Sequence, residues 1–311
     1  MEGKNARRPP PMSPGPLLKD SLKLRLLRWF GRREWIRYGV RFAVLRRFWD
    51  PYTPRVQTFE LNFFSLQYQG DFECYLDWYV YFFGAYEKEE LYLLRDLAQG
   101  CSDAVFVDIG ANIGQHSLYM AQHCHKVHAF EPYAEVRQRL ESGIALNQLA
   151  NIEIHPVALG AQDEQLDFYA PKGGNTGTGS FLATHEAENN ELVGQLQVVN
   201  GDAYVESLGL EHIDAVKIDV EGFEKNVLLG LQQTLAKYRP SVLMEFSPST
   251  QESFAGIDEF RSLLPDDYEI ATVNPHNKVL GIFSSPSYKL IDFDFDHPGS
   301  GLNILLRPRG N

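Results

Sequence analysis

A glycine-rich turn is the first feature of the sequence that could bind a ligand. It follows a short apolar run at 105–108, opens a segment with helical spacing at 113–122, and reads Asp108-Ile109-Gly110-Ala111-Asn112-Ile113-Gly114. Glycines in a strand-to-helix turn let a ligand approach the backbone closely. The turn alone does not separate ligand classes, because dinucleotide sites use the same device.

The carboxylate of Asp108 favours a ligand without phosphate. It stands two residues before the first glycine, where it would repel a pyrophosphate, and the third glycine of the dinucleotide fingerprint is missing. S-adenosylmethionine meets no such objection, because it carries an α-amino group and a sulfonium. Glu131 ends the next predicted strand, 23 residues after Asp108, and an acid there accepts hydrogen bonds from ribose hydroxyls. The alternative for Glu131 is a charge that favours the dipole of the following helix.

A second group of carboxylates lies later in the chain, at 217–224. Lys217, Asp219 and Glu221 project to one side at strand period. Asp219 falls near the carboxyl end of a predicted strand, where carboxylates suit a general base or a metal ligand. The alternative is an ion pair of Lys217 with Asp219, with Glu221 and Glu224 capping the next helix.

Strands and helices alternate from residue 105 onward, which indicates an open α/β sheet. Strands are predicted at 105–108, 126–131, 152–157, 215–220 and 241–246, and two more, at 268–273 and 303–306, could close the sheet. Helices are predicted at 113–122, from the second strand to about 147, and near 223–236. The glycine-rich segment 172–180 is predicted to be a flexible loop, either a plain connector or a lid.

Four segments are predicted along the chain. Residues 1–16 form a proline-rich disordered tail, and 17–58 form a basic amphipathic helical extension. Residues 59–100 form an aromatic-rich hairpin and a helix packed on the core, with a turn expected at Gln69-Gly70-Asp71. Residues 101–311 form the cofactor-binding catalytic domain.

Composition limits the classes of function. Of the 311 residues, 44% are hydrophobic and 23% charged, so the chain can bury a substantial core. The three cysteines contain no Cys-x-x-Cys pair, which fits a reducing compartment. The sequence has no run of about 18 uncharged apolar residues, and arginines interrupt the early leucine-rich stretch, which argues against a secretory signal. We therefore expect a cytoplasmic protein.

Charge is divided unevenly along the chain. Residues 1–50 carry a net charge of +9 and the remaining 261 a net charge of −21. An acidic body repels phosphate backbones, so nucleic acid is not expected as a partner. Segment 17–49 is expected to form two short amphipathic helices. Three alternatives are open for it: it would lie on an anionic membrane surface, pack on a partner or second subunit, or dock on the acidic body. Its apolar face would carry Leu22, Leu26, Trp29, Ile36, Val40 and Val44.

Several of these segments together resemble the FkbM-type methyltransferases, which are class I S-adenosylmethionine-dependent enzymes. The resemblance runs from about residue 84 to residue 246 and includes Asp202. It rests on Gly84-Ala85-Tyr86-Glu87, the turn at 107–114, Phe130-Glu131-Pro132, Val157-Ala158-Leu159-Gly160, and the stretch 216–224. It implies a mostly parallel seven-stranded sheet with helices on both faces, and O-methylation, often of sugar hydroxyls on glycans, glycolipids or natural products.

The resemblance also implies roles for individual residues. The methionine end of the cofactor would be lined by Asp108, Gly110, Asn112 and Gly114, with Tyr86 and Glu87 near its amino acid end. Glu131 would hold the ribose, and Ala158 would contact the adenine through its backbone. Asp219 and Glu221 would face the acceptor, with Glu245 as a weaker companion. Mg²⁺ between these carboxylates is compatible with the sequence but not required by it, and no metal ligand is assigned.

Other functions remain open at this point. A nicotinamide-dependent oxidoreductase is disfavoured by Asp108, and a non-catalytic cofactor-binding partner protein is disfavoured by the intact Asp219 and Glu221. The acceptor could also be a carboxylate, an amine or a protein. The oligomeric state does not follow from the sequence.

Overall fold

The computed structural model describes residues 15–53, 55–99, 101–171, 179–182, 190–274, 277–279, 283–285, 287–297 and 303–310. The predicted tail lies outside these residues except for Gly15 and Pro16. The predicted loop at 172–180 lies outside them except for Gly179 and Ser180. Among the helices described, none has both the length and the apolar character needed to cross a membrane.

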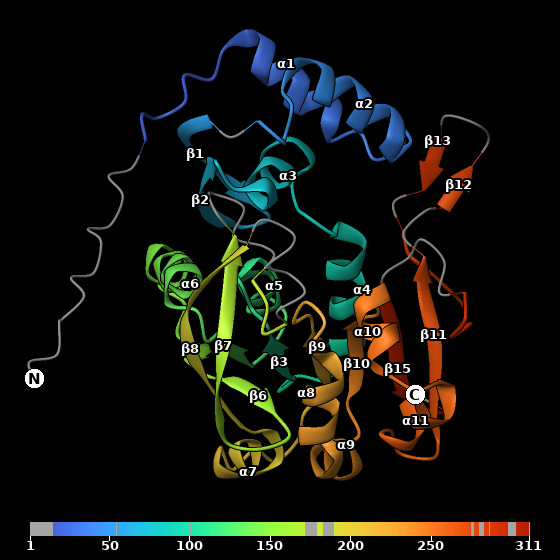
Figure 1. The fold of residues 1–311 in the computed structure, drawn as a ribbon. Coiled ribbons are helices and arrows are strands. Elements are labelled where there is room, and N and C mark those ends of the chain that lie inside the picture. The colour runs from blue at the N-terminus through green and yellow to red at the C-terminus, as the bar shows by residue number, and fades with distance from the viewer. Residues whose placement is uncertain are drawn as a thin grey trace, which may run out of the picture.

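The centre of the protein is a sheet whose eight strands, in spatial order, are β14-β11-β15-β10-β9-β3-β4-β5 (Figure 1). The five strands from β10 to β5 are parallel, and β15, β11 and β14 add antiparallel pairs at one side. The seven strands predicted from the sequence all belong to this sheet, and β14 is an additional edge strand. In chain order the strands are β3 (Val105–Ile109), β4 (Lys126–Phe130), β5 (Ile152–His155), β9 (Ala215–Ile218), β10 (Ser241–Glu245), β11 (Tyr268–Asn274), β14 (Lys289–Asp292) and β15 (Asn303–Pro308).

Helices cover both faces of the sheet, as predicted for this fold class. Successive strand residues point to opposite faces, so Phe106 packs in one apolar core with Leu118 and Leu140, while Val107 packs in the other with Val227. The first core is covered by α4 (Lys88–Ala98), α5 (Gln115–Met120) and α6 (Ala134–Asn147). The second is covered by α7 (Gly201–Ser207), α8 (Glu224–Gly230), α9 (Gln232–Tyr238), α10 (Pro248–Ser253) and α11 (Ile257–Ser262). The single helix predicted near 223–236 is thus two helices, divided at Leu231.

A second sheet stands beside the first, between β5 and β9 in the chain. It is formed by β6 (Ala158–Gly160), β7 (Glu164–Pro171) and β8 (Asn190–Asn200), in the order β6-β8-β7. The sequence analysis predicts no strand at β7 or β8, because much of both strands is polar and exposed. A separate short hairpin pairs β12 (Asn277–Val279) with β13 (Phe283–Ser285).

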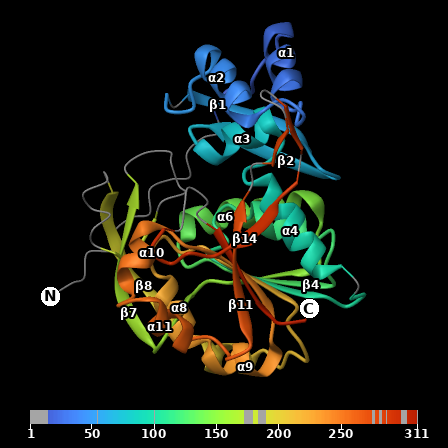
Figure 2. The same ribbon diagram turned by 90° about the vertical axis from the view of Figure 1, so that its right-hand side faces the viewer.

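An N-terminal layer packs on the α6 side of the main sheet. It contains α1 (Leu22–Gly31), α2 (Tyr38–Phe48), β1 (Arg55–Phe63), β2 (Leu66–Phe72) and α3 (Tyr75–Phe83). In both views α1 and α2 form the outermost part of the molecule, farthest from the main sheet (Figures 1 and 2). The helical extension predicted at 17–58 therefore corresponds to α1, α2 and the start of β1.

The turn of the β1–β2 hairpin differs from the prediction. It lies at Phe64 and Ser65, where Phe64 adopts a left-handed backbone with φ 54°, and not at residues 69–71. Gly70 lies within β2 because the strand packs tightly there: a Cβ on Gly70 would come within 2.5 Å of the Phe59 ring. This glycine indicates close packing rather than a turn.

A buried ion pair attaches the layer to the main domain. Asp77 of α3 is fully buried and accepts hydrogen bonds from Arg139 Nη2 of α6 at 2.6 Å and from the Tyr68 hydroxyl at 2.6 Å. The backbone N–H of Asp71 donates to the same carboxylate at 2.8 Å. With these partners a buried carboxylate can remain ionised, and α3 is fixed close to the segment that leads to Tyr86.

Candidate active site

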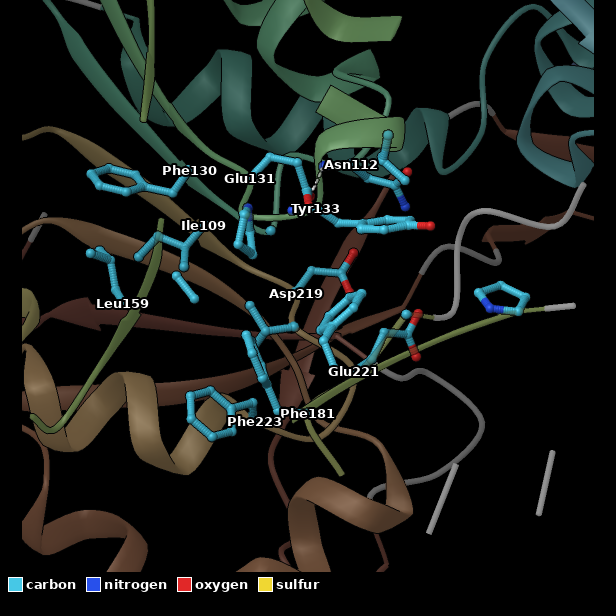
Figure 3. A pocket seen from close by; sticks show the side chains of 18 residues that line it. Ile109, Asn112, Phe130, Glu131, Tyr133, Leu159, Phe181, Asp219, Glu221 and Phe223 are labelled. Carbon is cyan, nitrogen blue, oxygen red and sulfur yellow. Dashed lines mark hydrogen bonds between the residues drawn. The ribbon is translucent and has the colours of Figure 1, made fainter. Parts of the chain in front are cut away.

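A pocket lies where the parallel strands β3, β4 and β9 end (Figure 3). Open α/β sheets bind ligands at this edge. Its walls include Gly110, Asn112 and Glu131 on one side and Asp219 and Glu221 on the other. Ala158 of β6 lines it as well. The structure therefore brings six of the predicted site residues into one cavity.

The glycine-rich turn is shaped by positive backbone angles. Gly110, Asn112 and Gly114 have φ of 83°, 53° and 86°, and the two glycines also face close neighbours. A Cβ on Gly110 would lie 1.9 Å from the carbonyl oxygen of Asp219, and one on Gly114 would lie 2.3 Å from Leu140 Cδ1. Gly110 thus lets β3 and β9 meet beneath the pocket, whereas Gly114 serves helix packing and is not among the residues that line the pocket.

Glu131 connects the glycine-rich turn with the end of β4. Its Oε2 accepts a hydrogen bond from the Asn112 N–H at 2.9 Å, and its Oε1 accepts one from the Tyr133 N–H at 2.9 Å (Figure 3). Burial raises the pKa of this carboxyl to about 7, and the two backbone donors oppose that rise. Each carboxylate oxygen has a second lone pair, so Glu131 can still accept a hydrogen bond from a ligand in the pocket.

An aromatic wall forms the other half of the pocket. The rings of Tyr133 and Phe168 lie 5.4 Å apart, those of Phe168 and Phe181 5.1 Å, and those of Phe181 and Phe223 5.0 Å. The rings are tilted or edge-to-face relative to one another, and together with Ala158 they line the pocket with apolar groups that suit a purine ring. The sequence analysis assigns no role to these aromatics, because Phe168 and Phe181 come from β7 and the segment after it, which it does not predict to face the site.

Asp108 lies behind the pocket and not in its wall. Its side chain is fully buried, and its Oδ2 accepts a hydrogen bond from the Ser117 hydroxyl at 2.6 Å. Its Oδ1 has no hydrogen-bond partner among the described residues. Burial raises the pKa of Asp108, while the nearby Lys217 opposes that rise.

Lys217 supplies the positive charge beneath the site. Its Nζ donates to Asp219 Oδ2 at 2.6 Å, and the side chain is almost completely buried. Burial alone would lower the pKa of this ammonium, but the charges of Asp219, Asp108 and Glu87 raise it above its usual value. The predicted alternative of a Lys217–Asp219 ion pair is confirmed, and Asp219 still lines the pocket.

Glu221 and Glu224 have different roles after β9. Glu224 is fully buried and accepts hydrogen bonds from the Val220 and Gly222 N–H groups at 3.1 and 3.2 Å and from the Thr250 hydroxyl at 2.7 Å. It therefore fixes the loop that presents Glu221 to the pocket. Glu221 itself has a left-handed φ of 51°, and burial together with the charge of Asp219 raises its pKa to about 8.

Tyr86 and Glu87 reach the site through α5. The Tyr86 N–H donates to Gln115 Oε1 at 2.7 Å, and Gln115 Nε2 donates back to the Tyr86 carbonyl at 2.9 Å. Neither Tyr86 nor Glu87 lines the pocket described above. Burial and the charge of Asp219 raise the pKa of Glu87 to about 7, which places its carboxylate in the same electrostatic cluster as Asp219.

Further acidic groups complete this cluster. Burial and the charges of Asp219 and Glu221 raise the pKa of Glu245 to about 10. Burial and the charge of Glu87 raise that of Glu90. One oxygen of Glu245 and one of Glu90 have no hydrogen-bond partner among the described residues. The cluster therefore holds several carboxylates beside Lys217, and a cationic ligand would be attracted to it.

Glu87, Glu90 and His116 also form a group that could hold a metal ion. One ligand atom from each lies within 4.8 Å of the others. His116 is buried, and burial and the charge of Lys217 lower its pKa well below the usual value, so the ring is neutral at pH 7. Two carboxylates and an imidazole suit Mn²⁺ or a similar divalent ion, although Lys217 would oppose it. Asp219 and Glu221, the pair considered for Mg²⁺, belong to no such three-donor group in the described part of the chain.

Backbone strain is concentrated at the site. Six non-glycine residues in the described part of the chain have a positive φ, and three of them are Glu87, Asn112 and Glu221. The other three have local reasons, since Phe64 forms a hairpin turn and two residues end helices. Strained positions of this kind cost about 1–3 kcal/mol and cluster at functional sites.

Comparison with known proteins identifies the family. The model of the Methyltransferase FkbM domain matches residues 108–269, which is just over half of the chain. The chain belongs to the FkbM methyltransferase family. The matched region contains Glu131, Asp219, Glu221 and Glu245, whereas Tyr86 and Glu87 precede it.

Three curated relatives show how far the similarity extends. The antimetabolite synthetase AmbE of Pseudomonas aeruginosa is 32% identical over 45% of this chain and 8% of its own length. The hexuronic acid methyltransferase AglP of Haloferax volcanii is 28% identical over 48% of this chain and 58% of its own. The 2-O-methyltransferase NoeI of Sinorhizobium fredii is 27% identical over 52% of this chain and 70% of its own. Among solved structures, an FkbM methyltransferase from Methylobacillus flagellatus KT covers 75% of this chain and 53% of its own at 14% identity, with a TM-score of 0.41.

Proposed function

We propose that the protein transfers a methyl group from S-adenosylmethionine to a hydroxyl oxygen of a sugar. One observation carries the proposal: the glycine-rich turn, Glu131, the aromatic wall and the carboxylates Asp219 and Glu221 all line one pocket. That set matches a ligand with a purine, a ribose and a positively charged end. The membership in the FkbM methyltransferase family supports it.

Each end of the pocket suits one part of the cofactor. The aromatic wall and Ala158 would hold the adenine, and Glu131 would accept hydrogen bonds from the ribose hydroxyls. The acidic cluster around Asp219 and Glu87 would attract the ammonium and sulfonium charges. Asp108 would act from behind the turn, by fixing the start of α5 through Ser117.

The bound cofactor would supply an electrophilic methyl group for in-line attack by the acceptor oxygen. The task of this chain is to orient the acceptor and take its proton. We assign the role of general base to Glu221, because its carboxylate lines the pocket and its raised pKa makes it a stronger base than an ordinary carboxylate. In this transfer the acceptor oxygen would gain the methyl group that the sulfonium loses, and Glu221 would receive the hydroxyl proton. The other product is S-adenosylhomocysteine.

The sugar acceptor is supported by the relatives. AglP is named for a hexuronic acid and NoeI for methylation at a 2-oxygen. The carboxylates at the mouth of the pocket are also groups that bind sugar hydroxyls by accepting hydrogen bonds. A carboxylate acceptor would be repelled by the same groups, which disfavours it.

Calorimetric titration of the purified chain with S-adenosylmethionine, and separately with NAD, tests the cofactor. We expect micromolar binding of S-adenosylmethionine alone. Glu131→Ala should weaken it more than tenfold, because a lost hydrogen bond to a charged group costs about 1.5–3 kcal/mol. Glu153→Ala, which alters an exposed carboxylate outside the pocket, is the matched control. Binding of NAD, or of neither ligand, would refute the proposal.

Transfer of labelled methyl groups to a panel of uronic acids, neutral hexoses and oligosaccharides tests the acceptor. A methyl ether on a sugar hydroxyl is the expected product. A methyl ester, on a uronic acid or elsewhere, would refute the hydroxyl assignment, and methylated amines or methylated protein would refute the sugar assignment. Either result would leave the cofactor assignment intact. Cofactor binding without transfer to any class of acceptor would favour a non-catalytic partner protein.

A further inference from the structure

The outer surface formed by α1 and α2 is unusually apolar. Sixteen large apolar side chains are exposed in the described part of the chain, and ten of them lie between residues 17 and 56. These ten are Leu17, Leu22, Leu26, Trp29, Trp35, Val40, Val44, Phe48, Tyr52 and Val56. Six of the ten lie on the two helices, and we call Leu22, Leu26, Trp29, Val40, Val44 and Phe48, together with the basic residues among them, the α1–α2 surface. Exposed apolar groups gathered in one region mark an interaction site.

The apolar side chains of α1 point away from the protein. Leu24 and Gly31 are buried against the layer below. Leu22, Leu26 and Trp29 recur at helical spacing on the opposite side and are 71%, 58% and 56% exposed. A helix that needed only to pack on the protein would carry polar residues there. The apolar face predicted from the sequence is thus not the face that α1 buries.

The second helix has the same two-sided character. It buries Arg41 and Leu45, and Arg41 Nη1 donates to the Gly31 carbonyl at 2.7 Å, which joins α2 to α1. Val40 and Val44 are exposed about 100° around the helix from Arg41 and Leu45, and Phe48 is exposed at the end of the helix. Both helices therefore keep an apolar side that packing inside the chain does not use. Segment 17–49 thus docks on the rest of the chain, as one of the predicted alternatives has it, but docking alone does not account for its exposed apolar side chains.

Charge indicates what covers this surface. Residues 15–56 contain eleven Lys and Arg residues and three Asp and Glu residues, whereas the whole chain has a net charge of −12. The exposed basic residues include Lys19, Lys23, Arg25, Arg46 and Arg47. A second copy docking through the same face would bring two positive surfaces together. An anionic bilayer offers negative headgroups for the basic side chains and an apolar interior for the leucines and tryptophans.

We propose that the α1–α2 surface docks on an anionic lipid bilayer. The helices would lie in the plane of the interface, with Leu22, Leu26 and Trp29 inserted and with the lysines and arginines reaching the headgroups. In Figure 1, α3 lies between this surface and α4, next to the segment that carries Tyr86 and Glu87. Docking would therefore turn the segment with Tyr86 and Glu87 toward the membrane. An acceptor attached to a lipid would then lie close to this end of the site.

Cosedimentation of the full chain with vesicles tests the proposal. We expect binding to phosphatidylcholine vesicles that contain 30% phosphatidylserine, weak binding to pure phosphatidylcholine, and a loss of binding at high salt. The triple variant Leu22→Ser, Leu26→Ser, Trp29→Ser should lower the partition coefficient more than tenfold. Lys23→Glu with Arg25→Glu should lower it by at least about fivefold for each basic side chain lost.

Controls separate docking from misfolding and from self-association. Leu192→Ser with Leu229→Ser removes exposed leucines elsewhere and should leave vesicle binding unchanged. The circular dichroism melting curves of all variants should match the parent, because every substituted side chain is exposed. Wild-type protein that stays in the supernatant, binds neutral and anionic vesicles equally, or binds as well when the three apolar residues are replaced would overturn the proposal. So would a dimer in sedimentation equilibrium that the triple variant dissociates.

Discussion

Lys217 Nζ lies 2.6 Å from Asp219 Oδ2, so a buried ammonium contacts a carboxylate that lines the pocket. Lys217 is almost fully buried on β9, whereas the Asp219 side chain is 32% exposed and lines the pocket. The hydrogen bond from Lys217 fixes the orientation of the Asp219 carboxylate and engages one of its two oxygens. The proposal therefore gives the two carboxylates different roles, with Asp219 as the oriented charge and Glu221 as the base.

Replacing Asp219 by Asn should separate binding from turnover. The amide keeps the shape of the side chain but removes its negative charge from the wall of the pocket. We expect the affinity for S-adenosylmethionine to change by less than about tenfold and kcat to fall by about 10²-fold. Calorimetry and a methyl-transfer assay measure the two quantities. Glu153→Gln is the matched control, and a variant with normal kcat would remove Asp219 from the catalytic machinery.

The rate should rise with pH, because the proposed base must lose its proton. Burial and the charge of Asp219 raise the pKa of Glu221 to about 8. Below that pH most of the free enzyme carries a protonated Glu221, which cannot accept the acceptor's proton. We therefore expect kcat/KM to increase from pH 6 to about 9 and then level off.

Glu221→Gln should lower kcat/KM by about 10²–10⁴-fold and remove the rise with pH. A variant that keeps the same pH profile at a lower rate would assign the base to another group. Glu245 and Glu87 are the next candidates, and their raised pKa values of about 10 and 7 would place the rise at different pH values. The pH at which kcat/KM rises therefore identifies the residue that acts as the base.

The stability of the ligand-free protein should fall as pH rises. The pKa values of Glu87, Glu221 and Glu245 are raised from 4.5 to about 7, 8 and 10. Between the unfolded value and each folded value, the native state binds more protons than the unfolded state, so the free energy of unfolding decreases with pH. The stabilisation is complete below pH 4.5 and is lost as pH passes through the folded values.

Glu245→Gln should flatten the upper part of this decline. When the native state binds one proton more than the unfolded state, the free energy of unfolding falls by about 1.4 kcal/mol per pH unit. The variant lacks this proton and should therefore lose less stability than the parent between pH 7 and 10. Urea unfolding at several pH values measures the slope. A parent protein whose stability rises over this range would contradict the arrangement of the acidic cluster.

The sequence predicts the sheet better than it predicts the site's surroundings. Strands such as β3 and β9 are short apolar runs, and this pattern identifies a strand buried on both faces. Gly70 looks like a turn residue, but it lies in a strand because Phe59 packs against it. β7 and β8 escape prediction because their exposed faces are polar and their pairing is not local.

The same distinction holds within the site. Glu131 and Asp219 were predictable because each follows a recognisable strand, and strand ends meet at one sheet edge. Glu90 and His116 join the cluster only because α4 and α5 pack together above β9, and nothing in the local sequence encodes that contact. The aromatic wall likewise needs the second sheet, whose Phe168 reaches across to Tyr133.

The glycine turn offers a sharp test of how the site is built. Gly110 has a φ of 83°, and a Cβ there would lie 1.9 Å from the Asp219 carbonyl oxygen, so Gly110→Ala must push β3 and β9 apart. We expect a loss of about 3 kcal/mol or more in unfolding free energy, together with the loss of S-adenosylmethionine binding. Urea denaturation and calorimetry measure both.

Gly39→Ala is the matched control for that substitution. Gly39 lies in α2 with open space around the position of a Cβ, and its backbone is not in the left-handed region. Gly39 lies in the first turn of α2, where the preference for alanine over glycine is at most about 0.5–1 kcal/mol, the value for a helix interior. This variant should therefore be at least as stable as the parent and bind the cofactor equally well. If Gly110→Ala behaved like Gly39→Ala, the backbone of Gly110 would not lie against the Asp219 carbonyl, and the close approach of the segments that follow β3 and β9 would be wrong.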